Sequence, residues 1–176
     1  MNPLTNSYYS GASNAQIIYE TIGSYFDKIA DVHSTNPALV VRHQGVNWTY
    51  GELQARVDRL ATGLIHLGIK PGDRVGIWGP NSSEWVLVQL ATAKIGAIMV
   101  CINPAYRLYE LEYALNKVEC MTLITDVSFK TSDYLGMINT LAPELESSHP
   151  GQLEAEKLPH LKHVIRMGSD LSLIHI

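Results

Sequence analysis

DRVGIWGPNSSEWVLVQLATAKIGAIMVCINP, residues 73–104, places a strand, a helix and a second strand in direct succession. The opening DRVGIWG is typical of a short buried strand, and Asn81 or Ser82 can cap the helix that follows it. That helix, SEWVLVQLATAKIG, is apolar on nearly every side, so we expect it to be covered all round. The run IMVCI then predicts the second strand. Two strands joined by a crossover helix favour a parallel pair.

The same alternation continues towards the C-terminus. Residues 106–118 predict a helix with one apolar stripe, MTLITD predicts a strand, and residues 128–145 predict a helix that stops near Pro143. The stretch from Pro143 to Pro159 resembles a long surface loop, and LKHVIRM predicts one more strand. Regular alternation of strands and helices predicts the α/β class: a mostly parallel sheet flanked by helices, with right-handed crossovers.

Towards the N-terminus, the sharpest signal is a helix start. Thr49 and Glu52 have the spacing of a capping box, and Gly68 resembles the glycine that ends the same helix. Gly63 inside this helix predicts close packing against a neighbour, because glycine is otherwise unfavourable there. Before it, residues 21–37 predict an amphipathic helix, and ALVVRH with VNWTY predicts a β-hairpin.

Composition excludes several classes of function. The chain has 176 residues with 46% hydrophobic and 17% charged residues and a formal net charge of -4, as expected for an ordinary globular domain. Acids and bases are interspersed, so no basic face for nucleic acid is predicted. No secretory signal, transit peptide or transmembrane segment is visible. Cys101 and Cys120 lie among apolar neighbours and lack the spacing of a zinc or redox pair. We therefore expect both to be buried free thiols.

A search for catalytic and ligand-binding motifs gives a negative result. None of the three strand-to-helix turns, GPNSSEW, NPAYRLYE and TDVSFKTSD, has the clustered glycines and lysine of a phosphate loop. His160 and His163 lack accompanying carboxylates or cysteines for a metal site, and His66 is expected to be structural. Glu110 and Glu112 face different directions on a helix, which argues against a pair of catalytic carboxylates. We therefore assign no catalytic, cofactor-binding or metal-binding residue.

Polar residues follow the apolar run IMVCI abruptly, in the stretch NPAYRLYELEYAL. Glu110 lies in the first turn of the predicted helix, where negative charge complements the helix dipole, and Arg107 can bridge to it. Tyr106, Tyr109 and Tyr113 predict an aromatic edge, which is more often a packing surface than a ligand cage. We interpret the change as the end of a strand and the start of a helix.

Taken together, four stretches resemble the N-terminal part of the adenylate-forming acyl-CoA synthetases, the AMP-binding superfamily. WTYGEL, residues 48–53, is similar to the first core motif of that family, and GIKPGDRVGIWGPNSSEWV is similar to the strand and helix that follow it. AKIGAIMVCINP is similar to the second core motif, with Lys94, Gly96, Asn103 and Pro104 in place. The stretch NPAYRLYELEYALNKVEC resembles the branch that activates fatty acids, and long runs elsewhere resemble its mitochondrial medium-chain ligases.

The resemblance implies an ATP-dependent acid–thiol ligase of which this chain is an N-terminal fragment. Such an enzyme condenses a fatty acid with ATP to an acyl-adenylate and pyrophosphate and passes the acyl group to CoA, with Mg²⁺ balancing phosphate charge. Its phosphate loop, its adenine and ribose contacts and its catalytic lysine come later in the family's sequence than this chain extends. The fragment is therefore expected to be inactive and to bind none of these cofactors. The resemblance also implies location in the mitochondrial matrix.

We divide the chain into a polar leader, residues 1–20, a partial N-terminal AMP-binding domain, residues 21–167, and a tail, residues 168–176. The tail no longer resembles the family and LSLIHI is similar to translated adapter read-through, so we expect it to be non-native. Uncovered sheet edges make self-association possible. Two other readings stay open: a short non-catalytic binding module that pairs with a full-length synthetase, and a generic doubly wound nucleotide-binding domain.

Overall fold

The structure is a computed structural model that describes residue 11, residues 17–168 and residues 174–175. A five-stranded sheet forms its centre, in the spatial order β4-β3-β5-β8-β9. Four of its strands run parallel, namely β3 (Arg74–Trp78), β4 (Ile98–Ile102), β5 (Thr122–Thr125) and β8 (His163–Arg166). β9 (Ile174–His175) pairs antiparallel with β8. The predicted α/β class is confirmed. The predicted non-native tail lies mostly outside the described residues.

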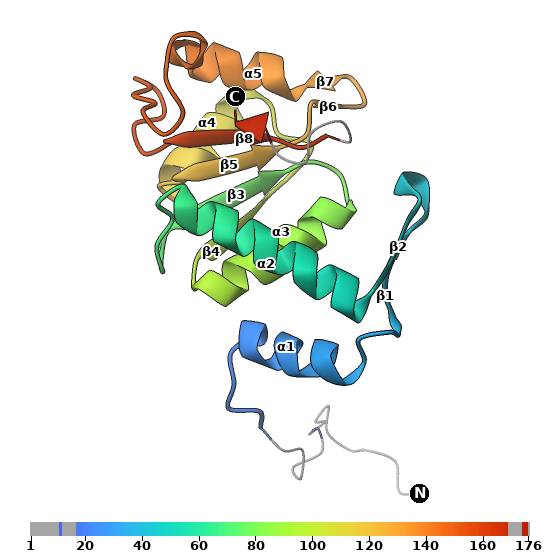
Figure 1. Cartoon of the computed structure of the whole chain (residues 1–176). Helices are drawn as coiled ribbons and strands as arrows, with labels where there is room; N and C mark the ends of the chain where they lie inside the picture. Colours follow the sequence, from blue (N-terminus) through green and yellow to red (C-terminus); the bar gives the residue numbers. More distant parts are fainter. Residues whose placement is uncertain (1–10, 12–16, 169–173, 176) are drawn as a thin grey trace, which may run out of the picture.

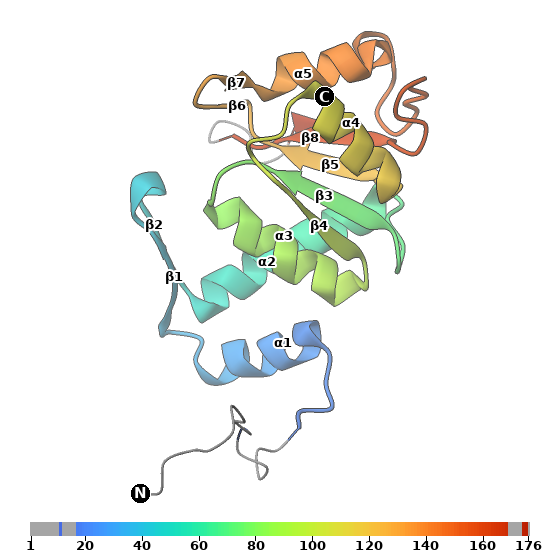
Figure 2. The same cartoon turned by 180° about the vertical axis from the view of Figure 1, so that it is seen from behind.

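Helices cover both faces of this sheet (Figures 1 and 2). α2 (Tyr50–His66) and α3 (Ser83–Ile95) cover one face, and α4 (Leu108–Lys117) and α5 (Tyr134–Leu141) cover the other. α1 (Ile22–Val32) lies outside α2 and α3 as a further layer. The side chains of alternate strand residues point to opposite faces and so form two cores, one around Ile77 and Ile124 and one around Trp78 and Leu123.

The arrangement of α3 agrees with its sequence, because an almost wholly apolar helix needs partners on several sides. α3 lies between α1, α2 and the sheet, and its buried residues include Val88 and Ala91. Its N-terminus differs from the prediction. Ser82 is the N-cap, but its side chain makes no capping hydrogen bond, and the Oε1 of Gln44 accepts from the Ser83 N–H at 2.7 Å instead.

The predicted capping box of α2 is confirmed. The Thr49 Oγ1 accepts from the Glu52 N–H at 3.3 Å, and the Thr49 N–H donates to the Glu52 Oε2 at 2.9 Å. Gly68 follows the end of the helix with a φ of +86°, a conformation that glycine adopts without strain. The prediction for Gly63 is wrong: this residue is exposed, and a Cβ there would meet nothing within 4 Å.

The predicted hairpin before α2 is confirmed. It consists of β1 (Pro37–Val41), a short 3₁₀ turn η1 (Arg42–Gln44) and β2 (Val46–Thr49), and the two strands are antiparallel. Gly45, with a φ of +66°, reverses the chain at the tip. Figure 1 shows the hairpin standing away from the central sheet, with α2 continuing directly from β2.

Three local predictions need correction. Residues 128–133 are a small hairpin, β6 (Ser128–Phe129) and β7 (Ser132–Asp133), rather than the first turns of α5. The predicted loop from Pro143 to Pro159 begins with the 3₁₀ helix η2 (Pro143–Glu146) and is mostly exposed, but its leucines at positions 145, 153 and 158 are buried and anchor it to the core. Cys101 is exposed because β4 is the edge strand, whereas Cys120 is buried as predicted.

Candidate functional site

The turn after β4 is fixed by two buried aromatic side chains from other elements. The Trp78 Nε1–H donates to the backbone oxygen of Asn103 at 3.1 Å, and the Tyr134 hydroxyl donates to the backbone oxygen of Pro104 at 2.6 Å. The two rings stack with centroids 3.8 Å apart, and both residues are fully buried. Burial raises the pKa of Tyr134, so its hydroxyl keeps the proton that it donates. This pair, which we call the aromatic clamp, therefore positions the turn.

Polar residues in the same turn start α4. The Asn103 Oδ1 accepts from the Ala105 N–H at 2.9 Å, and the Glu110 Oε2 accepts from the Arg107 N–H at 3.2 Å. The predicted strand end and helix start are thus observed, with the Arg107 backbone, not its guanidinium, as the partner of Glu110. Tyr109 and Tyr113 are exposed, so they do not form the packing edge that the sequence suggested.

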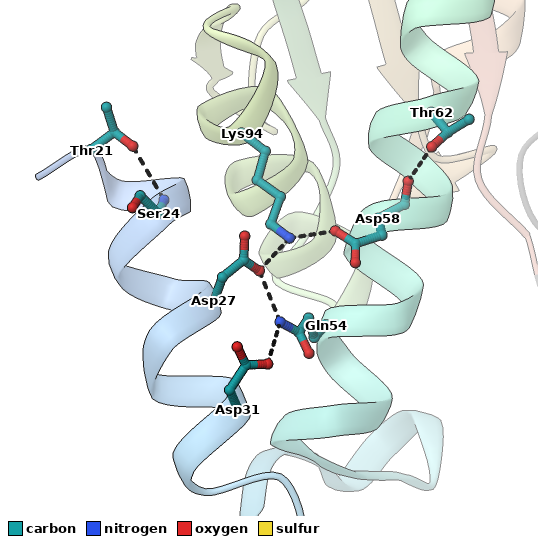
Figure 3. A network of polar contacts seen from close by, with 8 residues as sticks. All are labelled: Thr21, Ser24, Asp27, Asp31, Gln54, Asp58, Thr62 and Lys94. Atoms are coloured by element: carbon teal, nitrogen blue, oxygen red, sulfur yellow. Dashed lines mark hydrogen bonds and ion pairs between the residues drawn. The ribbon is translucent and has the colours of Figure 1, made fainter.

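Lys94 joins three helices through one ammonium group. Its Nζ lies 2.5 Å from the Asp27 Oδ1 on α1 and also contacts the Asp58 Oδ1 on α2, as Figure 3 shows. Gln54 extends this network by donating to Asp27 at 3.0 Å and to Asp31 at 3.3 Å. We call these residues the Lys94 network.

The electrostatics of the Lys94 network favour its charged form. Burial alone would lower the pKa of Lys94, but hydrogen bonds to Asp27 and Asp58 raise it above its ordinary value. Burial alone would raise the pKa of Asp27, but hydrogen bonds from Lys94 and Gln54 lower it. Because Lys94 is engaged by two carboxylates from neighbouring helices, it acts as a structural cross-link.

A cavity of about 790 Å³ lies between the β1–β2 hairpin, α2, α3 and the carboxyl ends of β5 and β8. The connection after β3 leads to α3 on one face of the sheet, whereas the connection after β5 leads to α5 on the other face. The cavity lies where these two connections separate. Open α/β sheets usually bind ligands at such a point. Among its lining residues are Trp48, Leu60, Leu87, Glu84, Asp126 and Met167.

Polar contacts fix the rim of this cavity. Gln44 at the hairpin tip donates from Nε2 to the Glu84 Oε2 at 2.8 Å, while its Oε1 accepts from the Ser83 N–H at 2.7 Å. Burial alone would raise the pKa of Glu84, but the hydrogen bonds, first that from Gln44, lower it, so this carboxyl is ionised at neutral pH. The Arg56 guanidinium lies 4.4 Å from the centre of the Trp48 ring, a cation–π contact.

The remaining candidates carry no site. Within the described residues, no group of three or more His, Cys, Asp or Glu side chains could hold a metal ion. His163 is buried in β8 and His160 is exposed before it, while the His66 Nδ1 lies 2.8 Å from the Thr62 oxygen on its own helix. The part of the chain that the structure covers contains no helix long and apolar enough to cross a membrane.

Comparisons with known proteins agree with each other. The family model described as AMP-binding enzyme matches residues 26–172. The mitochondrial medium-chain acyl-CoA ligase ACSF2 of Rattus norvegicus is 42% identical over 165 residues, which are 94% of this chain and 27% of the rat protein. The protein of the same name from Danio rerio is 40% identical over 162 residues, 92% of this chain and 27% of its own length.

Solved structures show the same similarity in three dimensions. The inhibitor-bound N-terminal domain of FACL13 from Mycobacterium tuberculosis superimposes with a TM-score of 0.68 and is 25% identical, over 85% of this chain and 33% of that domain. A second crystal form of the same domain gives a TM-score of 0.64 at 28% identity, over 76% of this chain and 32% of that domain. The chain thus spans about a quarter of the curated relatives and a third of an N-terminal domain crystallised alone.

Proposed function

Because the chain belongs to the AMP-binding enzyme family, we propose that it is an N-terminal piece of an ATP-dependent fatty acyl-CoA ligase. The whole enzyme would convert a medium-chain fatty acid, ATP and CoA to acyl-CoA, AMP and pyrophosphate by way of an acyl-adenylate. The identity of 42% to the rat medium-chain ligase over 94% of this chain carries the proposal. The name of that relative also motivates a mitochondrial location for the whole enzyme.

The residues of this piece build scaffold and do not carry the chemistry. Lys94, in the second core motif, contacts Asp27 and Asp58. Asn103 and Pro104, which end the same motif, have their backbone oxygens engaged by the aromatic clamp. The Lys94 ammonium and these two backbone oxygens are thus engaged within the protein. The described strand-to-helix turns contain no glycine-rich loop with a lysine, so they do not fit ATP and Mg²⁺, and no reaction step is assigned to these residues.

Equilibrium dialysis of the isolated chain with ATP and Mg²⁺ tests this assignment. We expect no saturable binding, because the described turns lack a phosphate loop. Saturable binding of one ATP per chain would contradict the scaffold role and would favour an independent nucleotide-binding domain.

The size of the native product tests the fragment proposal most directly. An antibody raised against residues 21–162 should detect, in a cell extract, a single band several times heavier than the 19.5 kDa of this chain. The length of the relatives supports this expectation, since the matched segment is 27% of the rat protein. A band only at 19.5 kDa would overturn the fragment proposal.

One observation favours a second candidate function, a short non-catalytic module that pairs with a full-length synthetase. β4 is the edge strand of the sheet and exposes Ile98 and Cys101, and an open edge can accept another strand. This candidate predicts that the 19.5 kDa chain co-purifies with the synthetase whether or not ATP and fatty acid are present. Co-purification that depends on those substrates would argue against it.

A further inference from the structure

We propose that the tip of the β1–β2 hairpin, residues 42–45, is a strap that closes over the cavity and can lift from it. In the closed state, which the structure describes, Gln44 of the strap accepts a hydrogen bond from the N-terminus of α3. When the strap lifts, Ser82 takes over as the cap of that helix. The inference concerns a movement of this chain alone and does not rest on the proposed function.

The strap is tied to α3 by both ends of one amide. The Gln44 Oε1 accepts from the Ser83 N–H at 2.7 Å, and the Gln44 Nε2 donates to the Glu84 Oε2 at 2.8 Å. Glu84 is ionised at neutral pH, and a hydrogen bond to a carboxylate is stronger than one to a neutral acceptor. Within the described residues, Gln44 makes the only side-chain hydrogen bonds between the strap and α3. Release of this one side chain therefore frees the strap.

The base of the hairpin is anchored independently of the strap. At the base, the Gly51 N–H at the start of α2 donates to the backbone oxygen of Ser34 at 2.9 Å. Further along β2, the Trp48 ring lies against the Arg56 guanidinium of α2. The four residues of the strap are all exposed, and Figure 1 shows the hairpin standing away from the central sheet. Segments with few buried contacts open at a small cost in free energy, so the strap can lift while the base stays in place.

A second cap for α3 is already in position. Ser82 occupies the N-cap with an extended backbone, the conformation from which a serine side chain accepts from an N–H two or three residues further on. Its side chain makes no such bond in the closed state. Serine is among the best N-cap residues, and rotation about its single side-chain bond is enough to make the contact. α3 is therefore capped in both states, by Gln44 when the strap is closed and by Ser82 when it is open.

Movement of the strap changes access to the cavity. His43, Gln44 and Val46 line the cavity from the hairpin, while Glu84 and Leu87 line it from α3. Lifting the strap breaks the link between these two walls. Since the Val46 side chain is only partly exposed in the closed state, the exposure of position 46 reports how often the strap is open.

Thiol labelling of the complete 176-residue chain tests the inference. The parent protein carries Val46→Cys as the reporter and Cys101→Ser to remove the exposed native thiol. The buried thiol of Cys120 is kept and reports unfolding of the sheet. Reaction with iodoacetamide followed by peptide mass spectrometry gives the labelling rate at both positions. Each rate is divided by that of the urea-unfolded chain, which removes differences in intrinsic reactivity.

Three substitutions are then added to the parent. Gln44→Ala removes the cap of the closed state, and Ser82→Ala removes the cap of the open state. Gln89→Ala, at an exposed position further along α3, is the control for loss of a glutamine side chain.

In the parent, position 46 should be labelled faster than Cys120, because the strap opens without unfolding the sheet. Gln44→Ala should speed labelling at position 46 by about fivefold or more, the factor that corresponds to loss of a typical cap. Ser82→Ala should slow it by about fivefold and leave Cys120 unchanged, because only the open state then lacks a cap. Gln89→Ala should change neither rate.

Three outcomes would overturn the inference. Equal labelling of position 46 and Cys120 in the parent would mean that the strap opens only when the whole chain unfolds. An unchanged rate at position 46 in Gln44→Ala would mean that this side chain does not hold the strap. An unchanged or faster rate there in Ser82→Ala would mean that Ser82 does not cap α3 in the open state.

Discussion

At the scale of single residues, the most consequential side chain is Lys94. Its side chain is only 13% exposed, and its ammonium group is engaged by carboxylates from α1 and α2. A buried charge is tolerated when its partners are close, and its removal leaves the partners uncompensated. The position of Lys94 in a core motif could be recognised from sequence. Its partners could not, because Asp58 lies 36 residues away and meets it only through helix packing.

Replacing Lys94 by methionine should lower the free energy of unfolding by about 1–3 kcal/mol, less than for a fully buried pair because both aspartates are partly exposed. Methionine keeps most of the side-chain volume, so the loss reports on the charge. Urea denaturation followed by circular dichroism measures it. Lys117→Met, at an exposed position on α4, is the control and should change stability by less than about 0.5 kcal/mol. Equal effects of the two changes would contradict a cross-linking role for Lys94.

The Lys94 network should also make the free energy of unfolding depend on pH in the acid range. The pKa of Asp27 is lower in the folded chain than its ordinary value, so the contribution of this carboxylate is complete above about pH 4 and is lost as the pH falls through the folded pKa. Urea midpoints between pH 2 and pH 7 should fall less steeply in Asp27→Asn than in the unaltered chain. Identical slopes would show that Asp27 titrates alike in the folded and unfolded states.

Tyr134 offers a second test at the residue scale. Tyr134→Phe removes the donor to the Pro104 oxygen and keeps the stacked ring, so we expect a loss of about 1–2 kcal/mol, the usual effect of leaving a buried acceptor without its donor. Thermal unfolding measures this loss. Tyr109→Phe removes a hydroxyl from a side chain that is 80% exposed and should be neutral. A neutral Tyr134→Phe would mean that the aromatic clamp acts through ring packing alone.

At the scale of elements, α1 is held by close contact as well as by charge. A Cβ added to Gly23 would lie 2.9 Å from the Lys94 Cα, so the two helix backbones touch at this glycine. The sequence predicted α1 as an amphipathic helix but gave no sign that Gly23 is its contact point. It pointed to Gly63 instead, because a glycine within a helix is unfavourable wherever it lies, and the sequence alone does not tell an exposed position from a packed one.

The two glycines predict opposite effects of one substitution. Gly23→Ala should destabilise the chain by about 1–3 kcal/mol, because the added methyl group must push α1 away from α3. Gly63→Ala should stabilise it by up to about 1 kcal/mol, since the methyl group meets nothing and the unfolded chain loses freedom. Chemical denaturation of both variants gives the comparison. Stabilisation by both changes would show that α1 is not packed against α3 at Gly23.

The features predicted correctly are those whose sequence signals come from residues close together in the chain. The Thr49 capping box and the alternation of strands and helices depend on residues near in sequence, and both are confirmed. The start of α5 was placed too early, because the β6–β7 hairpin depends on Lys130 with a φ of +53°, a conformation that lysine rarely adopts. The cavity was not foreseen at all, since its walls combine the hairpin, two helices and two strand ends.

At the scale of the whole molecule, the described residues leave a sheet edge and an apolar helix side uncovered. β4 is an unprotected edge, and the outward side of α1 exposes Ile22, Tyr25 and Val32. Open edges and apolar stripes favour association with other chains. The resemblance to part of a larger domain predicted open sheet edges. Which residues lie on them required the strand order.

The edge strand provides a test at this scale. The isolated chain should self-associate as its concentration rises, and Ile98→Lys should reduce that association, because a lysine on an edge strand disfavours strand pairing. Light scattering coupled to size-exclusion chromatography measures the mass. The control Ile65→Lys replaces an isoleucine of similar exposure, 56% against 53%, on α2. Equal reduction by both would point to general apolar contact rather than to the edge of β4.

The strand order has a consequence for synthesis on the ribosome. β3 emerges first, β4 then adds to one of its edges, β5 adds to the other, and β8 adds to β5. Each parallel strand after β3 therefore finds a neighbouring strand that has already been synthesised. Folding of this kind can keep pace with elongation at about 5–20 residues per second. The parallel strands of the sheet can thus assemble in the order in which they are synthesised.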